Sequence, residues 1–237
     1  RPYPHARIVN IDTSKARKVQ AVRAIVTGKD EPDRYVGKSI RDIPVLCWDK
    51  VRYIGDKVAA VAAETLEAGE EAVGLIEVQY EELPAVFDPL KAMEPGAPIL
   101  HDDASAYDGA PKDIMVKDIP NVCNRLTWKK GDVDQGFREA DLVIEHTFRV
   151  PLRHQGYIEP QAFLVAVEED GQVLAWSSSK SPFGTRAQLA KAIGLSPAKV
   201  RVHAVNVGGD FGGKGGPGDL PIAYFLARQA KRPVKIL

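Results

Sequence analysis

The residues best suited to chemistry form one glycine-rich stretch, GGDFGGKGGPG, from Gly208 to Gly218. Seven of its eleven residues are glycine. Because glycine has no Cβ, the main chain can turn sharply there and bring bare N–H groups close to a ligand. Such N–H groups can hold anionic or carbonyl oxygens. The stretch therefore predicts a loop that contacts a cofactor.

Three interpretations of this loop are open. The first is a turn that binds nothing, although so many glycines carry a large entropy cost for a mere turn. The second is a phosphate-binding loop, because the stretch ending at Lys214 matches GxxxxGK. Gly215 stands, however, where a magnesium-binding Ser or Thr is required, and Pro217 prevents a helix from starting at the lysine. The third, which we favour, is a loop that presses its backbone against a flat cofactor, with Phe211 as a packing wedge or a wall of the pocket.

Strands and helices on both sides must position this loop. In the second half the pattern predicts helices at 133–140, 182–193 and 221–230, and strands at 122–129, 142–150, 163–167, 173–177, 200–207 and 234–237. Pro182 marks the start of the middle helix and Gly194 its end. Trp128 and Trp176 lie in strand patterns, which leads us to expect both in the core.

The first half also mixes strands and helices. The pattern predicts strands at 6–11, 22–27, 57–63 and 76–81, and a helix at 66–73. Thr65 is suited to cap that helix. From about Pro84 to Pro120 six prolines interrupt the chain, which predicts a connection between two domains. The fold class expected from both halves is α+β.

Composition excludes several function classes. The chain has 237 residues and a formal net charge of zero, which argues against broad binding to nucleic acid or membrane surfaces. No apolar run approaches the roughly 20 residues that a membrane span needs. The five histidines and the cysteines Cys47 and Cys123 lack the spacing of a metal site. We expect two reduced cysteines and a cytoplasmic protein.

Several segments, taken in chain order, resemble one known family. They are PHARI (4–8), VRYIGDKVAAV (51–61), YEELPAV (80–86), GDVD (131–134), IEP (158–160) and GGDFGGK (208–214). Together they resemble the molybdopterin-binding large subunit of the xanthine dehydrogenase, aldehyde oxidase and carbon monoxide dehydrogenase family, whose loop reads GGGFGGK. The similarity runs through nearly the whole chain in the same order, which is more specific than any single motif.

The resemblance implies an architecture, cofactors and partners. It implies an α/β hammerhead domain at 1–110, a linker at 111–120 and the N-terminal part of a molybdenum cofactor-binding domain at 121–237. The cofactor would be molybdopterin with molybdenum, in a dinucleotide form. The partners would be the remaining C-terminal half of that domain, an iron–sulfur subunit with 2Fe-2S clusters and a flavin subunit with FAD. The abrupt ends at Arg1 and Leu237 lead us to expect a fragment, or one chain of a split protein.

The resemblance also assigns site residues. In the family, backbone at this motif contacts the molybdenum centre and the pterin, which implies cofactor binding by Gly209, Asp210, Phe211, Gly212 and Gly213. Asp210 replaces a glycine of the family motif. Because an anionic centre would repel its carboxylate, we expect that side chain to point away or to pair with a cation such as Lys214 or Arg186.

Other departures from the family limit the function. Gly215 stands where purine hydroxylases carry a substrate-holding glutamate, so purines are not the expected substrates. Arg153 occupies the position of a family glutamine, with Gln155 close by, and either could approach the metal. The family's general base is a glutamate in a far C-terminal segment. No catalytic residue is therefore assigned in this chain, and Glu159 is expected to be structural.

Two functions are consistent with these features. The first is part of a molybdenum hydroxylase, an oxidoreductase that hydroxylates an aldehyde or aromatic heterocycle with oxygen from water and passes electrons to iron–sulfur clusters and flavin. The alternative is a relative of the same fold that binds no molybdenum and serves as an assembly or docking module.

Overall fold

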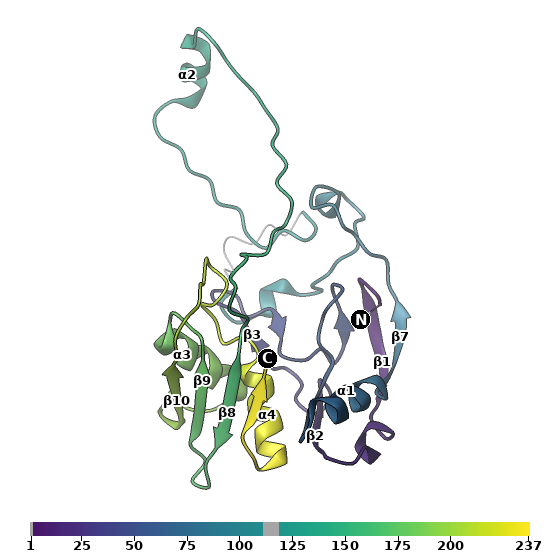
Figure 1. Cartoon of the computed structure of the whole chain (residues 1–237). Coiled ribbons are helices and arrows are strands. Elements are labelled where there is room, and N and C mark those ends of the chain that lie inside the picture. Colours follow the sequence, from purple (N-terminus) through teal and green to yellow (C-terminus); the bar gives the residue numbers. More distant parts are fainter. Residues whose placement is uncertain (1, 111–118) are drawn as a thin grey trace.

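The computed structural model describes residues 2–110 and 119–237. The N-terminal elements (purple to blue) and the C-terminal elements (green to yellow) lie side by side, and one excursion rises away from both (Figure 1). The linker predicted at 111–120 lies almost entirely outside the described residues.

The N-terminal half confirms the elements predicted there. The confirmed elements are β1 (Ala6–Asp12), β2 (Val22–Thr27), β6 (Ala59–Ala63), α1 (Leu66–Gly74) and β7 (Glu77–Glu82), and the structure adds β3 (Tyr35–Val36), β4 (Ile43–Pro44) and β5 (Lys50–Val51). The strands form the antiparallel sets β5-β1-β7, β2-β6 and β3-β4. The hydroxyl of Thr65 accepts a hydrogen bond from the Ala68 N–H (3.2 Å), as expected of a helix cap. The short strands β3, β4 and β5 were not predicted, because a strand of two residues is too short to show an alternation of apolar and polar residues.

The C-terminal half is built on one four-stranded sheet. Its elements are α2 (Val133–Glu139), β8 (Phe163–Val167), β9 (Val173–Ser177), α3 (Pro182–Ile193), β10 (Val200–Ala204), α4 (Leu220–Ala230) and β11 (Val234–Ile236). The strand order is β10-β9-β8-β11, with β9 and β10 parallel and the other pairs antiparallel. The hairpin and the helices are confirmed, and Gly194 ends α3 in the left-handed conformation (φ 73°).

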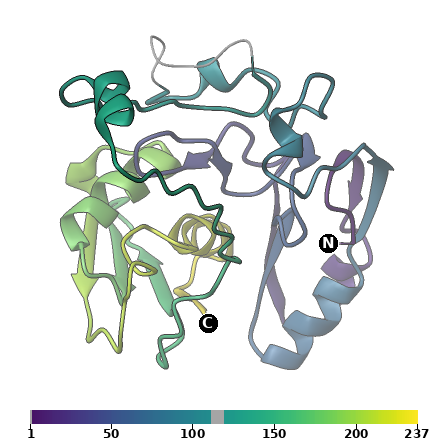
Figure 2. The same cartoon turned by 90° about the horizontal axis from the view of Figure 1, so that it is seen from above.

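Helix α4 is the centre of the main core. It packs against β8 on one side and β2 on the other, and Figure 2 shows it lying between the two halves. Its residues from Leu220 to Ala227 are all buried, and all of them except Pro221 share one apolar cluster with Val26, Leu46 and Val165. The two halves are thus held together by common packing. Within the described residues, no helix has the length and apolar composition needed to cross a membrane.

Two predicted strands are absent, and both lie in the excursion at residues 122–156, hereafter the arm. Segments 122–129 and 142–150 have no regular structure, and only α2 at the tip is ordered as a helix. Trp128 is 87% exposed, so its expected place in the core is wrong. Trp176 is half-buried and stacks on His203 of β10, with ring centres 5.0 Å apart. Strand pairing explains the failure, because β-forming residues need a neighbouring strand.

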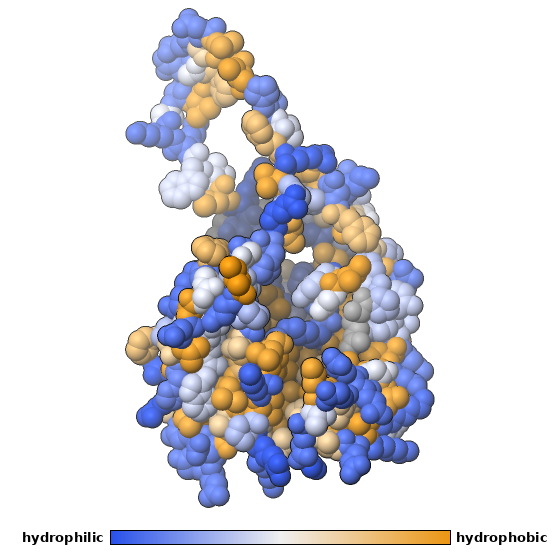
Figure 3. Space-filling model, in the orientation of Figure 1, coloured by the Kyte–Doolittle hydropathy of each residue, from blue (hydrophilic) through white to orange (hydrophobic). Residues whose placement is uncertain are grey.

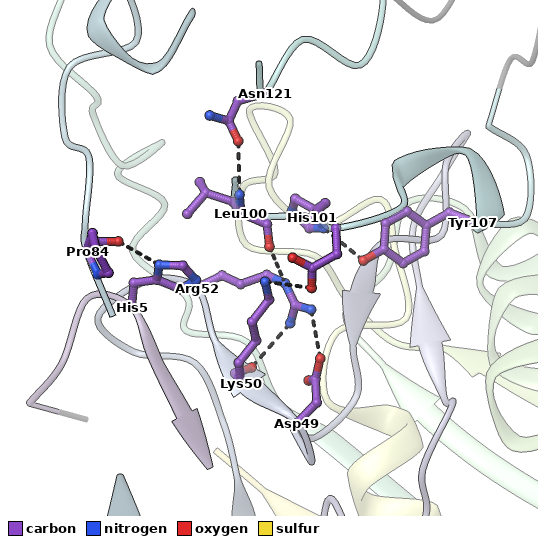
Figure 4. A network of polar contacts seen from close by, with 10 residues as sticks. His5, Asp49, Lys50, Arg52, Pro84, Leu100, His101, Tyr107 and Asn121 are labelled. Carbon is purple, nitrogen blue, oxygen red and sulfur yellow. Dashed lines mark hydrogen bonds and ion pairs between the residues drawn. The ribbon is translucent and has the colours of Figure 1, made fainter. Parts of the chain in front are cut away.

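The proline-rich connection is fastened to the N-terminal half over its described part, 84–110. A network of polar contacts holds it (Figure 4). Arg52 donates from Nε to the main-chain oxygen of Leu100 (3.1 Å), and Lys50 pairs with Asp102 (2.9 Å). His5 Nδ1 lies 2.7 Å from the main-chain oxygen of Pro84. This stretch is therefore a strap against the domain surface.

The two cysteines are expected to differ in reactivity. Cys47 is 1% exposed, and burial raises the pKa of its thiol to about 12, so almost no reactive thiolate exists at pH 8. Cys123 in the arm is exposed. Iodoacetamide at pH 8 should label Cys123 alone in the native chain and both thiols in denaturant, as peptide mass spectrometry can measure. Rapid native labelling of Cys47 would contradict this packing.

Candidate functional site

The glycine-rich loop connects β10 to α4 and has no helix or strand of its own. Two segments distant in sequence hold it. The Lys180 N–H, just before α3, donates to the main-chain oxygen of Lys214 (3.2 Å). Gln161 Nε2, just before β8, donates to the main-chain oxygen of Gly213 (3.2 Å). The strand order brings both segments to the same end of the sheet as the loop.

Lys214 is the buried anchor of the loop. Its side chain is 1% exposed, forms an ion pair with the Glu159 carboxylate and donates to the Glu159 main-chain oxygen (2.9 Å). The ammonium also lies 4.6 Å from the ring centre of Tyr157. The same carboxylate accepts the Gly208 N–H (2.8 Å), so Glu159 ties both ends of the motif together. The Lys214 bond, with a smaller part from Gly208, holds the pKa of Glu159 below its ordinary value. This arrangement agrees with the structural role expected for Glu159.

Asp210 clamps the loop from within. Its Oδ1 accepts the Lys214 N–H (2.7 Å) and its Oδ2 accepts the Gly212 N–H (2.8 Å). Its main-chain oxygen accepts the Gly213 N–H (2.7 Å). Lys180 pairs with the same carboxylate at 2.6 Å and is the main cause that lowers the pKa of Asp210. The negative charge of Asp210 is thus balanced by Lys180, and both carboxylate oxygens accept N–H groups of the loop.

Asp210 does pair with a cation, as expected, but that cation is Lys180 and not the side chain of Lys214 or Arg186. Lys214 reaches Asp210 only through its main-chain N–H. The guanidinium of Arg186 lies 5.7 Å from the ring centre of Phe183. No local pattern could single out Lys180, because 30 positions separate it from Asp210 and only the fold brings them together.

The backbone of the loop uses conformations that favour glycine. Gly209 and Gly212 both have φ near +94°, and Phe211 between them has φ 43°. The Phe211 side chain is 74% exposed, and an added Cβ at Gly209 would lie 3.1 Å from its ring. The ring therefore covers Gly209 and is otherwise open. It is no wedge inside this chain, and its role as a wall of a cofactor pocket stays a prediction.

The segment before β8 packs closely under the loop. A Cβ at Gly213 would lie 2.6 Å from the Tyr157 ring and 3.1 Å from Gln155 Oε1. Gln155, rather than Arg153, is thus the side chain of that pair found against the loop. Tyr157 was not predicted as a site residue, although its neighbours in the IEP segment gave a signal. It also borders an open groove of about 640 Å³, together with Gln161 and Asp219.

The loop fits an oxygen-rich, anionic group. Among the described residues, the N–H groups of Gly209, Asp210 and Phe211 have no hydrogen-bond partner, whereas those on either side are used within the protein. Uncharged main-chain donors can hold such oxygens without reacting with them. The five residues predicted to bind a cofactor therefore combine unpaired donors, close-approach glycines and a neutralised carboxylate.

The phosphate-loop interpretation does not fit this geometry. The Lys214 ammonium is buried and committed to Glu159, so it is not free to reach a phosphate. Helix α4 begins only at Leu220, so its N-terminus does not follow the lysine.

Substituting Asp210 with Asn should loosen the loop. The two N–H groups bind different oxygens of Asp210, whereas an amide has only one acceptor oxygen and no charge to balance Lys180. We expect amide exchange at Gly212 and Lys214 to become about tenfold faster at pH 7. Because the pKa of Asp210 is lowered by folding, the wild-type clamp is present at neutral pH and is lost only as pH falls through that lowered value. Asp134→Asn, at an exposed position of α2, is the control. Unchanged exchange in Asp210→Asn would contradict the clamp.

Family models of known proteins match both halves of the chain. Residues 1–84 match the a/b hammerhead domain of aldehyde oxidase and xanthine dehydrogenase. Residues 115–237, more than half of the chain, match the molybdopterin cofactor-binding domain. The second match contains both the arm and the glycine-rich loop.

Individual relatives agree with these matches. The chain is 39% identical to a probable xanthine dehydrogenase subunit of Bacillus subtilis (strain 168), over 99% of this chain and 29% of that protein. It is 34% identical to the nicotinate dehydrogenase large molybdopterin subunit of Eubacterium barkeri, over 99% of this chain and 52% of that protein. A solved Cu,Mo-CO dehydrogenase superposes with a TM-score of 0.83 at 30% identity, over 98% of this chain and 30% of that chain. The chain thus spans between 29% and 52% of these three relatives' lengths.

Proposed function

Because the chain belongs to the xanthine dehydrogenase, aldehyde oxidase and carbon monoxide dehydrogenase family of molybdopterin-binding large subunits, we propose that it forms part of a molybdenum hydroxylase. Its substrate would be an aldehyde or an aromatic heterocycle, hydroxylated with oxygen from water. One observation carries the proposal: within the described residues, the loop at the family motif leaves the N–H groups of Gly209, Asp210 and Phe211 unpaired, while Lys180 neutralises the Asp210 carboxylate. Residues 1–110 would be the hammerhead domain, 111–120 the linker and 121–237 the start of the cofactor-binding domain.

The residues of this chain would bind and orient the cofactor. When bound, the molybdenum cofactor supplies two-electron oxidation of a C–H carbon. The N–H groups of Gly209, Asp210 and Phe211 would donate to its oxygens, and Gly212 and Gly213 would let the backbone approach it closely. The Lys214–Glu159 pair and the Asp210 clamp would hold these donors fixed before the cofactor arrives, so that little reorganisation is needed. We assign no catalytic base to this chain.

The proposal extends to partners. The C-terminal half of the cofactor-binding domain would complete the site, and 2Fe-2S and FAD subunits would carry electrons away. The names of the relatives, a large molybdopterin subunit and a carbon monoxide dehydrogenase large chain, support a multi-subunit assembly. We propose a dinucleotide form of the pterin and a cytoplasmic location. The missing carboxylate at Gly215 argues against purine substrates.

Isotope labelling tests the reaction class. The assembled complex would be incubated with aldehydes and N-heterocycles in oxygen-18 water, with a dye as electron acceptor. The product should gain oxygen from water and two electrons should reach the dye, so that R–H and H2O give R–OH and two protons. Product oxygen derived from O2 would contradict the proposal.

A further inference from the structure

The arm presents an apolar face that nothing in the described chain covers. Its members are Leu126 (73% exposed), Trp128 (87%), Leu142 (74%), Ile144 (68%), Phe148 (85%) and Val150 (87%). Figure 3 shows apolar side chains (orange) along the arm where it stands clear of the body. Exposed apolar groups on this scale mark interaction sites in folded proteins.

The spacing of these residues is that of β-strands. In 142–150 one face carries Leu142, Ile144, His146, Phe148 and Val150, and the other carries Val143, Glu145, Thr147 and Arg149, so the first face is the more apolar. In 122–129, Leu126 and Trp128 alternate with polar residues in the same way. A strand of this pattern buries one face and leaves the other in water.

The main chain of both segments is also unpaired. Within the described part of the chain, no backbone hydrogen bond involves residues 122–130 or 142–153, and the arm's own bonds are confined to α2 and the Gly156 turn. The rows of N–H and C=O groups are therefore free to pair with another strand, as at an open sheet edge. Sequence pattern and unpaired backbone point to the same missing neighbour.

We propose that the arm is the docking element for the polypeptide that completes the cofactor-binding domain. Segments 122–129 and 142–150 add as strands to a sheet edge of that partner, and the apolar face is buried against it. Free in the isolated chain, the arm becomes ordered on binding. This inference rests on the proposed function, since that function requires a second half of the domain.

Three observations favour this occupant. The arm lies inside the region that matches the molybdopterin cofactor-binding domain, so it is part of that domain. The three relatives compared above contain substantially more chain than this one. The arm returns through Tyr157 and Glu159, which hold the glycine-rich loop, so a partner seated on it stands next to the proposed cofactor contacts.

Amide hydrogen exchange tests the docking. Segments 122–130 and 142–150 would be followed in the isolated 237 residues and in the natural assembly purified through a tag on this chain. Exchange should be fast in the free chain and at least about a hundredfold slower in the assembly, because strand pairing protects amides. Fast exchange in an assembly that contains its partners would overturn the proposal.

Paired variants separate the apolar face from the polar face of the same strands. Phe148→Asp and Trp128→Asp should weaken recovery of the completing polypeptide about tenfold or more, because each removes a buried aromatic ring and adds an unpaired charge. Thr147→Asp and Thr127→Asp add the same charge one position away and should have little effect. Since all four positions are exposed in the free chain, none of the changes should impair its folding. Equal loss in both pairs would overturn the predicted faces.

Other outcomes distinguish this inference from the proposed function. An assembly with a protected arm but no molybdenum or pterin would refute the function and keep the docking. A molybdenum-containing assembly with a fast-exchanging arm would refute the docking alone. Protection that appears in a homodimer of the isolated chain would assign the face to a second copy and overturn the proposal.

Discussion

Replacing Lys214 with Met is expected to remove most of the molybdenum cofactor from the assembled protein. Methionine keeps a side chain of similar length but has no ammonium, so the Glu159 carboxylate loses its buried partner and the two ends of the loop are no longer tied together. Substitution of residues that hold the metal-binding groups in place typically lowers metal affinity about 10–100-fold. We therefore expect at least about a tenfold lower molybdenum content, measured by elemental analysis of the assembled fraction.

Two further variants make this result specific. Lys38→Met, at an exposed position, should retain the wild-type molybdenum content. Glu159→Gln can still accept the Gly208 N–H through its amide oxygen, so it should retain more cofactor than Lys214→Met. Full molybdenum content in Lys214→Met would show that the Lys214–Glu159 ion pair is not needed to hold the cofactor.

Phe225→Ala is expected to cause the largest loss of stability. Phe225 is 1% exposed in α4 and belongs to the cluster that joins β2 to β8. Removing a buried aromatic ring leaves a cavity and costs about 3–5 kcal/mol in the free energy of unfolding. Because α4 connects the two halves, the loss should lower the urea midpoint of both halves together.

The matched control is Phe183→Ala in α3. Phe183 is 77% exposed, so its removal should change the free energy of unfolding by less than about 0.5 kcal/mol. Urea denaturation followed by circular dichroism measures both variants. If Phe225→Ala unfolded only the C-terminal sheet and left β1 and β7 folded, the shared core inferred from α4 would be wrong.

Sequence patterns predicted those parts of the fold whose signals are local. Thr65 at the start of α1, and Pro182 and Gly194 at the ends of α3, act through neighbours within four residues. The β8–β9 hairpin likewise depends on a short turn. Such signals do not need the rest of the protein.

The failures have a common physical cause, which is dependence on distant partners. Segments 122–129 and 142–150 have good strand patterns, yet a strand needs a neighbour, and none is present for them among the described residues. The same limit applies to the site. The motif located the loop, whereas the Lys180–Asp210 and Lys214–Glu159 ion pairs join residues 30 and 55 positions apart. No spacing rule covers such pairs.

We propose above that the glycine-rich loop contributes to a molybdenum cofactor site. The most direct test of this proposal is the molybdenum and pterin content of the fully assembled complex, with elemental analysis for the metal and fluorescence of the oxidised pterin. We predict molybdenum and pterin in equal amounts, each stoichiometric with this chain. A fully assembled complex that contains neither would contradict the account.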